Sequence, residues 1–220
     1  MAKTAPSKPP ARQALKSASK PVVRALTAAD LPGLLAVQLA CYGAGFVESA
    51  ELFARRLASA TNCSLVLERD GVVCAYLAAY QSLRGKVTPL HGDFGLIEHA
   101  GSIAPKALTT PTTQTPAPDT LYLHDLAVLP SCAGQGLAQA LLQPLWAEAA
   151  ERGLRHSALV SVQGSQAYWA RHGYAEHALA CNAQRAHLAS YGDGAVYMVR
   201  ELQKHRTSDL SHIFHPIRSG

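Results

Sequence analysis

The stretch Leu121–Ala150 reads LYLHDLAVLPSCAGQGLAQALLQPLWAEAA and carries the strongest structural signal in the chain. It predicts a buried strand, then a turn containing Gly134 and Gly136, then a long helix with apolar residues at helical spacing. The first N–H groups of a helix have no partner within it, and the helix dipole adds partial positive charge there. Because glycine has no Cβ, an anion can approach the backbone of such a turn closely. The stretch therefore predicts a turn that binds a phosphate group.

Two segments, in order, resemble the GNAT superfamily of N-acetyltransferases. Gly134–Ala138 (GQGLA) resembles the acyl-CoA pyrophosphate loop of that family, whose pattern is Arg/Gln-x-x-Gly-x-Gly/Ala. Residues 162–174 (VQGSQAYWARHGY) resemble its later helix, which ends in Tyr-x-x-x-Gly-Phe. The resemblance covers residues 21–202. It implies one α/β (α+β) domain with a central mixed, twisted sheet of six or seven strands, flanked by helices, in which two parallel strands splay apart at the acyl-CoA site.

The resemblance also implies acetyl-CoA as the cosubstrate. Backbone groups of the strand before the loop would hold the pantetheine chain, and the Val128 N–H would donate to the thioester carbonyl. The implied cofactor-binding residues are Leu126, Ala127, Val128, Ala133, Gly134, Gln135, Gly136, Leu137, Ala138, Ser165 and Tyr168. No histidines have metal-ligand spacing such as His-Glu-x-x-His, so we expect no metal.

Three positions depart from the family pattern. Ala133 stands at the Arg/Gln position of the loop, Val162 stands at a family asparagine, and Trp169 stands at the usual general-acid tyrosine. Two functions therefore stay open. The first is an N-acetyltransferase that moves an acetyl group from acetyl-CoA to a primary amine of a small molecule or peptide, by direct attack in a ternary complex. The second is a catalytically weak acyl-CoA-binding or regulatory module. Thiol release with a panel of amines separates them.

The candidate catalytic residues are His124, Asp125 and Tyr168. Strand alternation predicts that His124 and Asp125 point to opposite faces of the sheet and cannot pair. His124 is either the proton acceptor for the incoming amine or a hydrogen-bonded structural histidine. Asp125 is either a base or a brace for a loop or helix N-terminus. Tyr168 is either the proton donor to the CoA thiolate or a core aromatic residue.

The candidate acceptor site lies between two predicted helices, residues 28–39 and 48–60. Tyr42, Phe46 and Glu48 occupy this linker, and we expect them to bind the acceptor together with a mobile loop at about 82–120. A glutamate there would suit a cationic amine, although it could instead cap the second helix.

Composition limits the remaining classes. The chain has 220 residues, and 48% of them are hydrophobic, which is enough for one domain with a real core. All excess positive charge lies in residues 1–24, which contain no acid, so we expect residues 1–20 to form a disordered basic leader and residues 203–220 a tail. The five cysteines show no metal spacing and favour reduced thiols in the cytoplasm. We expect no membrane partner, no specific nucleic acid, and a possible homodimer.

Overall fold

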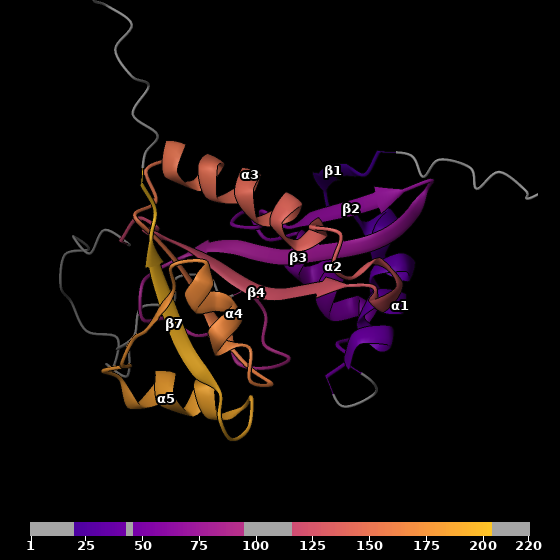
Figure 1. Cartoon of the computed structure of the whole chain (residues 1–220). Coiled ribbons are helices and arrows are strands. Elements are labelled where there is room, and N and C mark those ends of the chain that lie inside the picture. The colour runs from indigo at the N-terminus through magenta and orange to yellow at the C-terminus, as the bar shows by residue number, and fades with distance from the viewer. Residues whose placement is uncertain (1–19, 43–45, 95–115, 204–220) are drawn as a thin grey trace, which may run out of the picture.

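The computed structural model describes residues 20–42, 46–94 and 116–203 (Figure 1). The expected leader and tail therefore lie almost wholly outside the described residues. The strands are β1 (Val22–Ala25), β2 (Leu65–Arg69), β3 (Val72–Ser82), β4 (Thr120–Val128), β5 (His156–Ser161), β6 (Ala175–Glu176) and β7 (Val196–Glu201). The helices are α1 (Leu31–Tyr42), α2 (Ala50–Leu57), α3 (Leu137–Glu151), α4 (Gln166–Arg171) and α5 (Asn182–Ala189), with 3₁₀ turns η1 (Ala28–Asp30) and η2 (Pro130–Cys132).

The strands form one seven-stranded sheet in the order β1-β2-β3-β4-β5-β7-β6. Only β4 and β5 pair in parallel, and every other neighbouring pair is antiparallel. The long α3 connects β4 to β5, which is the connection that parallel neighbours require. This arrangement confirms the predicted mixed sheet, with helices on both sides.

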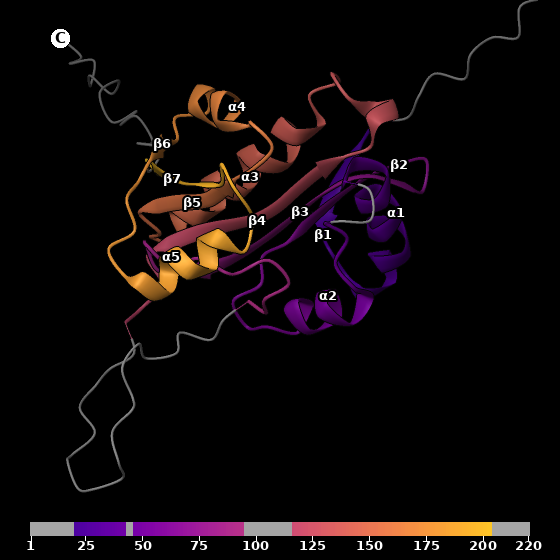
Figure 2. The ribbon, with the colours of Figure 1, turned by 90° about the horizontal axis from the view of Figure 1, so that it is seen from below.

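Helices cover both faces of the sheet, as Figure 2 shows, with α3 and α4 on one face and α1, α2 and α5 on the other. On the first face, Leu141, Leu142 and Trp146 of α3 are buried against the sheet. Each such side chain contributes roughly 1.5–3 kcal/mol by leaving water. On the other face, Leu34 and Phe53 anchor α1 and α2. The two packed layers hold the strands between them in fixed positions.

The parallel strands β4 and β5 separate before either strand ends. Residues Thr120–Leu123 of β4 pair with His156–Leu159 of β5. Beyond Leu123, β4 continues to Val128 with no partner on β5. The expected splay is therefore confirmed.

The free edge of β4 presents N–H groups to this gap, because the carbonyls of Leu126 and Val128 already accept from the Tyr42 hydroxyl at 3.1 Å and the Cys41 thiol at 3.2 Å. Leu129 N–H donates to the Cys74 carbonyl at 2.8 Å, which makes Ala75 and Val128 a non-hydrogen-bonded pair of the β3–β4 ladder. The N–H and C=O of Val128 therefore point away from β3, toward the side that β5 has left. Leu126, two residues earlier, has the same orientation.

Two expected elements differ from the structure. The helix predicted to start near Gly134 begins at Leu137, because Gly134 and Gly136 both adopt left-handed backbone angles that a helix excludes. The expected loop at about 82–120 is shorter at both ends, because Ser82 ends β3 and Thr120 begins β4, and its residue Val87 is hydrogen-bonded to Gln184 and His187 of α5. Residues 95–115 lie outside the described part of the chain.

Candidate active site

A cavity of about 370 Å³ follows the gap between β4 and β5. It runs from Ala138 in the first turn of α3 to His124 and Asp125 in the middle of β4. A second cavity of about 60 Å³ continues from these two strand residues to Phe46. The predicted residues that line the larger cavity are Tyr42, His124, Asp125, Leu126, Val128, Ala138, Ser165 and Tyr168. Ala127 does not line it, because its side chain is buried in the apolar cluster beneath α1.

The turn between η2 and α3 presents free donors to solvent. Gly134 and Gly136 have φ angles of 74° and 75°, and a Cβ added at either position would meet nothing within 4 Å. The glycines are thus needed for the backbone conformation rather than for space. Among the described residues, no acceptor takes the N–H of Gly134, Gln135 or Gly136. These donors, with the dipole of a 15-residue helix behind them, are suited to an anion, and residues 133–138 are called the anion-binding turn below.

A β-bulge changes the expected direction of two catalytic candidates. Ala78 pairs with Asp125, whereas Ala79 pairs with Leu123, so His124 is an extra residue in the ladder. The expectation that His124 and Asp125 face opposite sides is therefore wrong. Both side chains line both cavities on the face of the sheet that α1 and α2 cover.

Asp125 is held by neutral donors. The Tyr42 hydroxyl donates to its Oδ1 at 2.6 Å, the Tyr76 hydroxyl donates to Oδ2, and the Gln38 amide contacts Oδ2 at 3.4 Å. Burial, and after it the Asp125 charge, raises the pKa of both tyrosines well above the ordinary value, so both remain donors. Within the described residues Asp125 forms no ion pair. It braces the end of α1, and its charge is left unbalanced beside the cavity.

Glu48 lines the smaller cavity with Tyr42 and Phe46, as expected, but its charge is already paired. Its two oxygens accept from Arg56 at 2.5 and 2.7 Å, and both side chains are almost fully buried. The backbone N–H of His91 also donates to Glu48 Oε1, at 3.1 Å. Burial opposes ionisation of Glu48, but hydrogen bonds from His124 and Arg56 outweigh it and hold the pKa of Glu48 well below its usual range. Glu48 is therefore no free charge for an amine, and it does not cap α2, where Ser49 is the N-cap.

His124 lies between two oxygen atoms. Its Nε2 is 3.4 Å from Glu48 Oε1, and its Nδ1 is 3.4 Å from the Tyr191 hydroxyl. An ionised carboxylate only accepts, so Nε2 carries the hydrogen in the first contact. The side chain of His124 is 2% exposed, and the Phe94 ring packs edge-on to it at 5.8 Å. The imidazole is thus fixed in orientation, with Nδ1 facing Tyr191.

Sequence reasoning missed Tyr191 and the helix α5 that precedes it. The Tyr191 hydroxyl donates to the Thr88 carbonyl at 2.8 Å, and Gln184 of α5 accepts from the Val87 N–H at 2.6 Å. These bonds fasten residues 87–91 over the smaller cavity. The helix has no buried residue, so it lacks the apolar stripe that would have revealed it.

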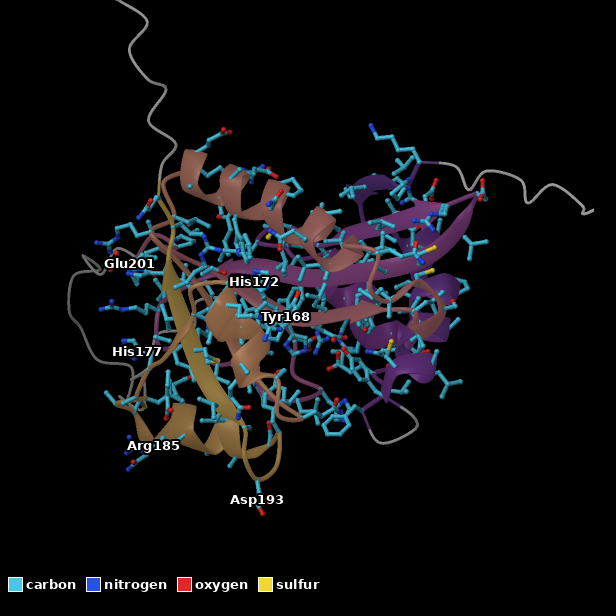
Figure 3. All side chains as sticks on the ribbon, in the orientation of Figure 1. Tyr168, His172, His177, Arg185, Asp193 and Glu201 are labelled. Atoms are coloured by element: carbon cyan, nitrogen blue, oxygen red, sulfur yellow. The ribbon has the colours of Figure 1, made fainter. Side chains whose placement is uncertain are left out.

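Tyr168 and Trp169 take different positions on α4. Tyr168 is half-buried beside the larger cavity, and its hydroxyl has no hydrogen-bond partner among the described residues. Burial raises the pKa of Tyr168, although Arg171 opposes this, so the hydroxyl remains a donor. Its ring lies 4.7 Å from that of His172, which follows α4 (Figure 3). Trp169 is 8% exposed and packs edge-on against Tyr174 in the core.

The chain belongs to the acetyltransferase (GNAT) family, whose profile matches residues 34–174. A search among curated proteins finds no match.

Solved structures show the same fold at low identity. The ribosomal-protein-S18-alanine N-acetyltransferase from Escherichia coli is 19% identical, with a TM-score of 0.56, covering 86% of this chain and 98% of its own. The PaiA N-acetyltransferase from Thermoplasma acidophilum, in complex with coenzyme A, is 11% identical, with a TM-score of 0.53 and coverage of 83% and 99%. The GphF GNAT-like decarboxylase, in complex with isobutyryl-CoA, is 19% identical, with a TM-score of 0.59 and coverage of 83% and 100%.

The residues present fit an acyl-CoA. The turn offers unpartnered N–H groups to a pyrophosphate, the free edge of β4 offers N–H groups to an extended amide chain, and the cavity runs along that edge from Ala138, two residues after Gly136. Among the described residues, no group of three or more His, Cys, Asp or Glu is placed to hold a metal ion. In the same part of the chain, no helix has the length and apolar character needed to cross a membrane.

Proposed function

We propose that this protein transfers an acetyl group from acetyl-CoA to a primary amine of a small molecule or peptide, by direct attack in a ternary complex. The observation that carries the proposal is one continuous cavity. It runs from Ala138, in the first turn of α3, along the free edge of β4 to the polar pair His124 and Asp125.

The cofactor brings a thioester that is already activated, so the tasks left to the protein are positioning, charge stabilisation and proton removal. The N–H groups of the turn hold the pyrophosphate. The N–H groups of Leu126 and Val128 would hold the pantetheine arm in the place of a neighbouring strand. The Val128 N–H would donate to the thioester carbonyl and stabilise negative charge on its oxygen.

His124 is the proposed proton acceptor. Since Nε2 donates to Glu48, the lone pair of the ring is on Nδ1, beside the Tyr191 hydroxyl. A proton leaving the amine reaches Nδ1 directly or through a water beside Tyr191. Glu48 thus acts through the imidazole as a positioning residue, and it stabilises the positive charge that the ring acquires.

Asp125 is the proposed recognition group for the amine. Its charge is not balanced by a described cation, so it attracts an ammonium to the junction of the two cavities. Tyr168, with a free hydroxyl beside the larger cavity, is the proposed donor to the departing thiolate. Tyr42 orients Asp125, and Phe46 forms an apolar wall of the smaller cavity.

The test is thiol release from acetyl-CoA with a panel of amines, and mass spectrometry of the acetylated product. Turnover with at least one amine, strongly reduced in both His124→Ala and His124→Gln with unchanged binding of acetyl-CoA, supports the proposal, since neither replacement can accept a proton. Binding of acetyl-CoA without turnover on any amine would instead favour the weak binding or regulatory module, which the replacements at Val162 and Trp169 suggest. Absence of binding would refute both.

A further inference from the structure

The anion-binding turn has no cationic side chain of its own. Residues 133–138 are Ala-Gly-Gln-Gly-Leu-Ala, so backbone dipoles alone would face the two negative charges of a pyrophosphate. Backbone N–H groups and a helix dipole supply only partial charge. A pyrophosphate site of this kind is therefore incomplete in charge unless another segment contributes a cation.

Arg69 is the cation that the fold brings to this turn. It is the last residue of β2, before the tight turn formed by Asp70 and Gly71, both of which have positive φ. Its Nη1 donates to Gln135 Oε1 at 2.8 Å, across 66 positions of sequence. No other described arginine donates a hydrogen bond to a residue of the turn. The guanidinium therefore lies directly beside the free N–H groups.

The described protein leaves most of the hydrogen-bonding capacity of Arg69 unused. A guanidinium has five N–H donors, and Gln135 accepts one of them. The Nε of Arg69 is buried without an acceptor. Within the described residues Arg69 forms no ion pair, whereas the nearby Glu68 is paired with Arg24. A cation held beside an anion-binding turn, and not neutralised by any acid, is suited to a phosphate.

We infer that Arg69 binds the pyrophosphate of acetyl-CoA and supplies the cationic contact that Ala133 lacks. The inference rests on the proposed function, since it concerns the cosubstrate of that reaction. Gln135 holds the guanidinium against the turn, and phosphate oxygens accept from the remaining Nη donors, since Nε is buried. Arg69 is thus a binding residue for the cosubstrate and takes no part in proton transfer.

The experiment measures binding by titration calorimetry with three ligands: acetyl-CoA, acetyl-dephospho-CoA and S-acetylpantetheine. The variants are Arg69→Gln, which removes the charge, and Arg69→Lys, which keeps a charge without the planar fork. Arg55→Gln is the matched control, because Arg55 is an exposed arginine paired with Asp93. Thermal unfolding of each variant verifies the fold.

We expect Arg69→Gln to weaken acetyl-CoA binding by about tenfold, since charge-assisted bonds are strong but this one is solvent-exposed. In the same variant, the affinity for acetyl-dephospho-CoA should fall by the same factor, and the affinity for S-acetylpantetheine should not change. The affinity of Arg69→Lys for acetyl-CoA should lie between those of the wild type and Arg69→Gln. The affinity of Arg69→Gln should also depend less on salt than that of the wild type. Arg55→Gln should bind all three ligands normally.

Three results would overturn the inference. Unchanged acetyl-CoA affinity in Arg69→Gln would mean that Arg69 does not contact the bound cosubstrate. A loss for acetyl-CoA without a loss for acetyl-dephospho-CoA assigns Arg69 to the 3′-phosphate instead. An equal loss with S-acetylpantetheine makes the effect structural. If wild-type protein binds none of the three ligands, the proposed function itself fails, which is a different outcome from failure of the Arg69 contact alone.

Discussion

Replacement of Glu48 by glutamine tests the arrangement around the acceptor cavity most directly. Glu48→Gln keeps the size and shape of the side chain but removes the charge opposite Arg56, which is 1% exposed. A buried charge that loses its partner costs about 3–5 kcal/mol. For a domain of this size, each kcal/mol lowers Tm by roughly 2–4 °C, so we expect a fall of roughly 6–20 °C.

The chain contains a matched control for this substitution. Arg152 and Glu148 form an ion pair with the same N–O distance as Arg56 and Glu48, 2.5 Å, but both side chains are about half exposed. Glu148→Gln should therefore cost about 0.5 kcal/mol or less. The double variant Glu48→Gln/Arg56→Met removes both buried charges and should recover part of the stability lost in the single variant.

Acid pH gives a second readout of the same pair. The pKa of Glu48 is lowered in the folded protein, so its contribution is full above the unfolded carboxyl pKa of about 4.3 and is lost as pH falls below it. The Tm difference between wild type and Glu48→Gln should be constant near neutral pH and should narrow in acid. In the amine assay the variant should lower kcat and leave KM for the amine unchanged, because Glu48 acts through His124. An unchanged Tm, or a rise in KM alone, would refute this reasoning.

Three further perturbations follow from the same geometry. Gly136→Asp should weaken acetyl-CoA binding at least about tenfold in calorimetry, because it adds a negative charge at the turn and strains a backbone with a φ of 75°; normal affinity would mean that the turn does not hold the pyrophosphate. Asp125→Asn should remain folded at neutral pH and should raise KM for cationic amines by roughly three- to tenfold. An unchanged KM would exclude recognition of the amine by the charge of Asp125. Hydrogen bonding to Arg24 lowers the pKa of Asp30 to about 2, so wild type should be more stable than Asp30→Asn above pH ~3.9 and should lose this advantage toward pH 2, as followed by urea unfolding.

The parts of the molecule that the sequence predicts are those determined by residues close together in the chain. The turn at Gly134 and Gly136 depends on two glycines and a following apolar helix, all within one short stretch. The hairpin at Asp70-Gly71 likewise depends on a dipeptide that favours positive φ. The parallel pairing of β4 and β5 then follows from their connection, since α3 is long enough for a crossover.

The parts that sequence does not predict depend on contacts between distant segments. Nothing local distinguishes Glu48 from a solvated glutamate, because its partner Arg56 and the enclosing Phe94 come together only in the folded protein. Arg69 contacts Gln135 across 66 positions for the same reason. Tyr191 follows a helix that has no buried residue and only one partly buried leucine, Leu188, so periodicity gives no sign of it.

The bulge at His124 shows why the site forms where it does. Pairing of β4 with β5 stops at Leu123, and the extra residue in the β3–β4 ladder is the next one. A bulge bends its strand and increases the local twist, which turns the rest of β4 away from β5. The same extra residue reverses the alternation once, so that His124 and Asp125 fall on one face. Strand alternation alone fails here because it assumes an unbroken period of two. A single inserted residue thus accounts both for the opening of the cavity and for the side-by-side placement of the two polar groups within it.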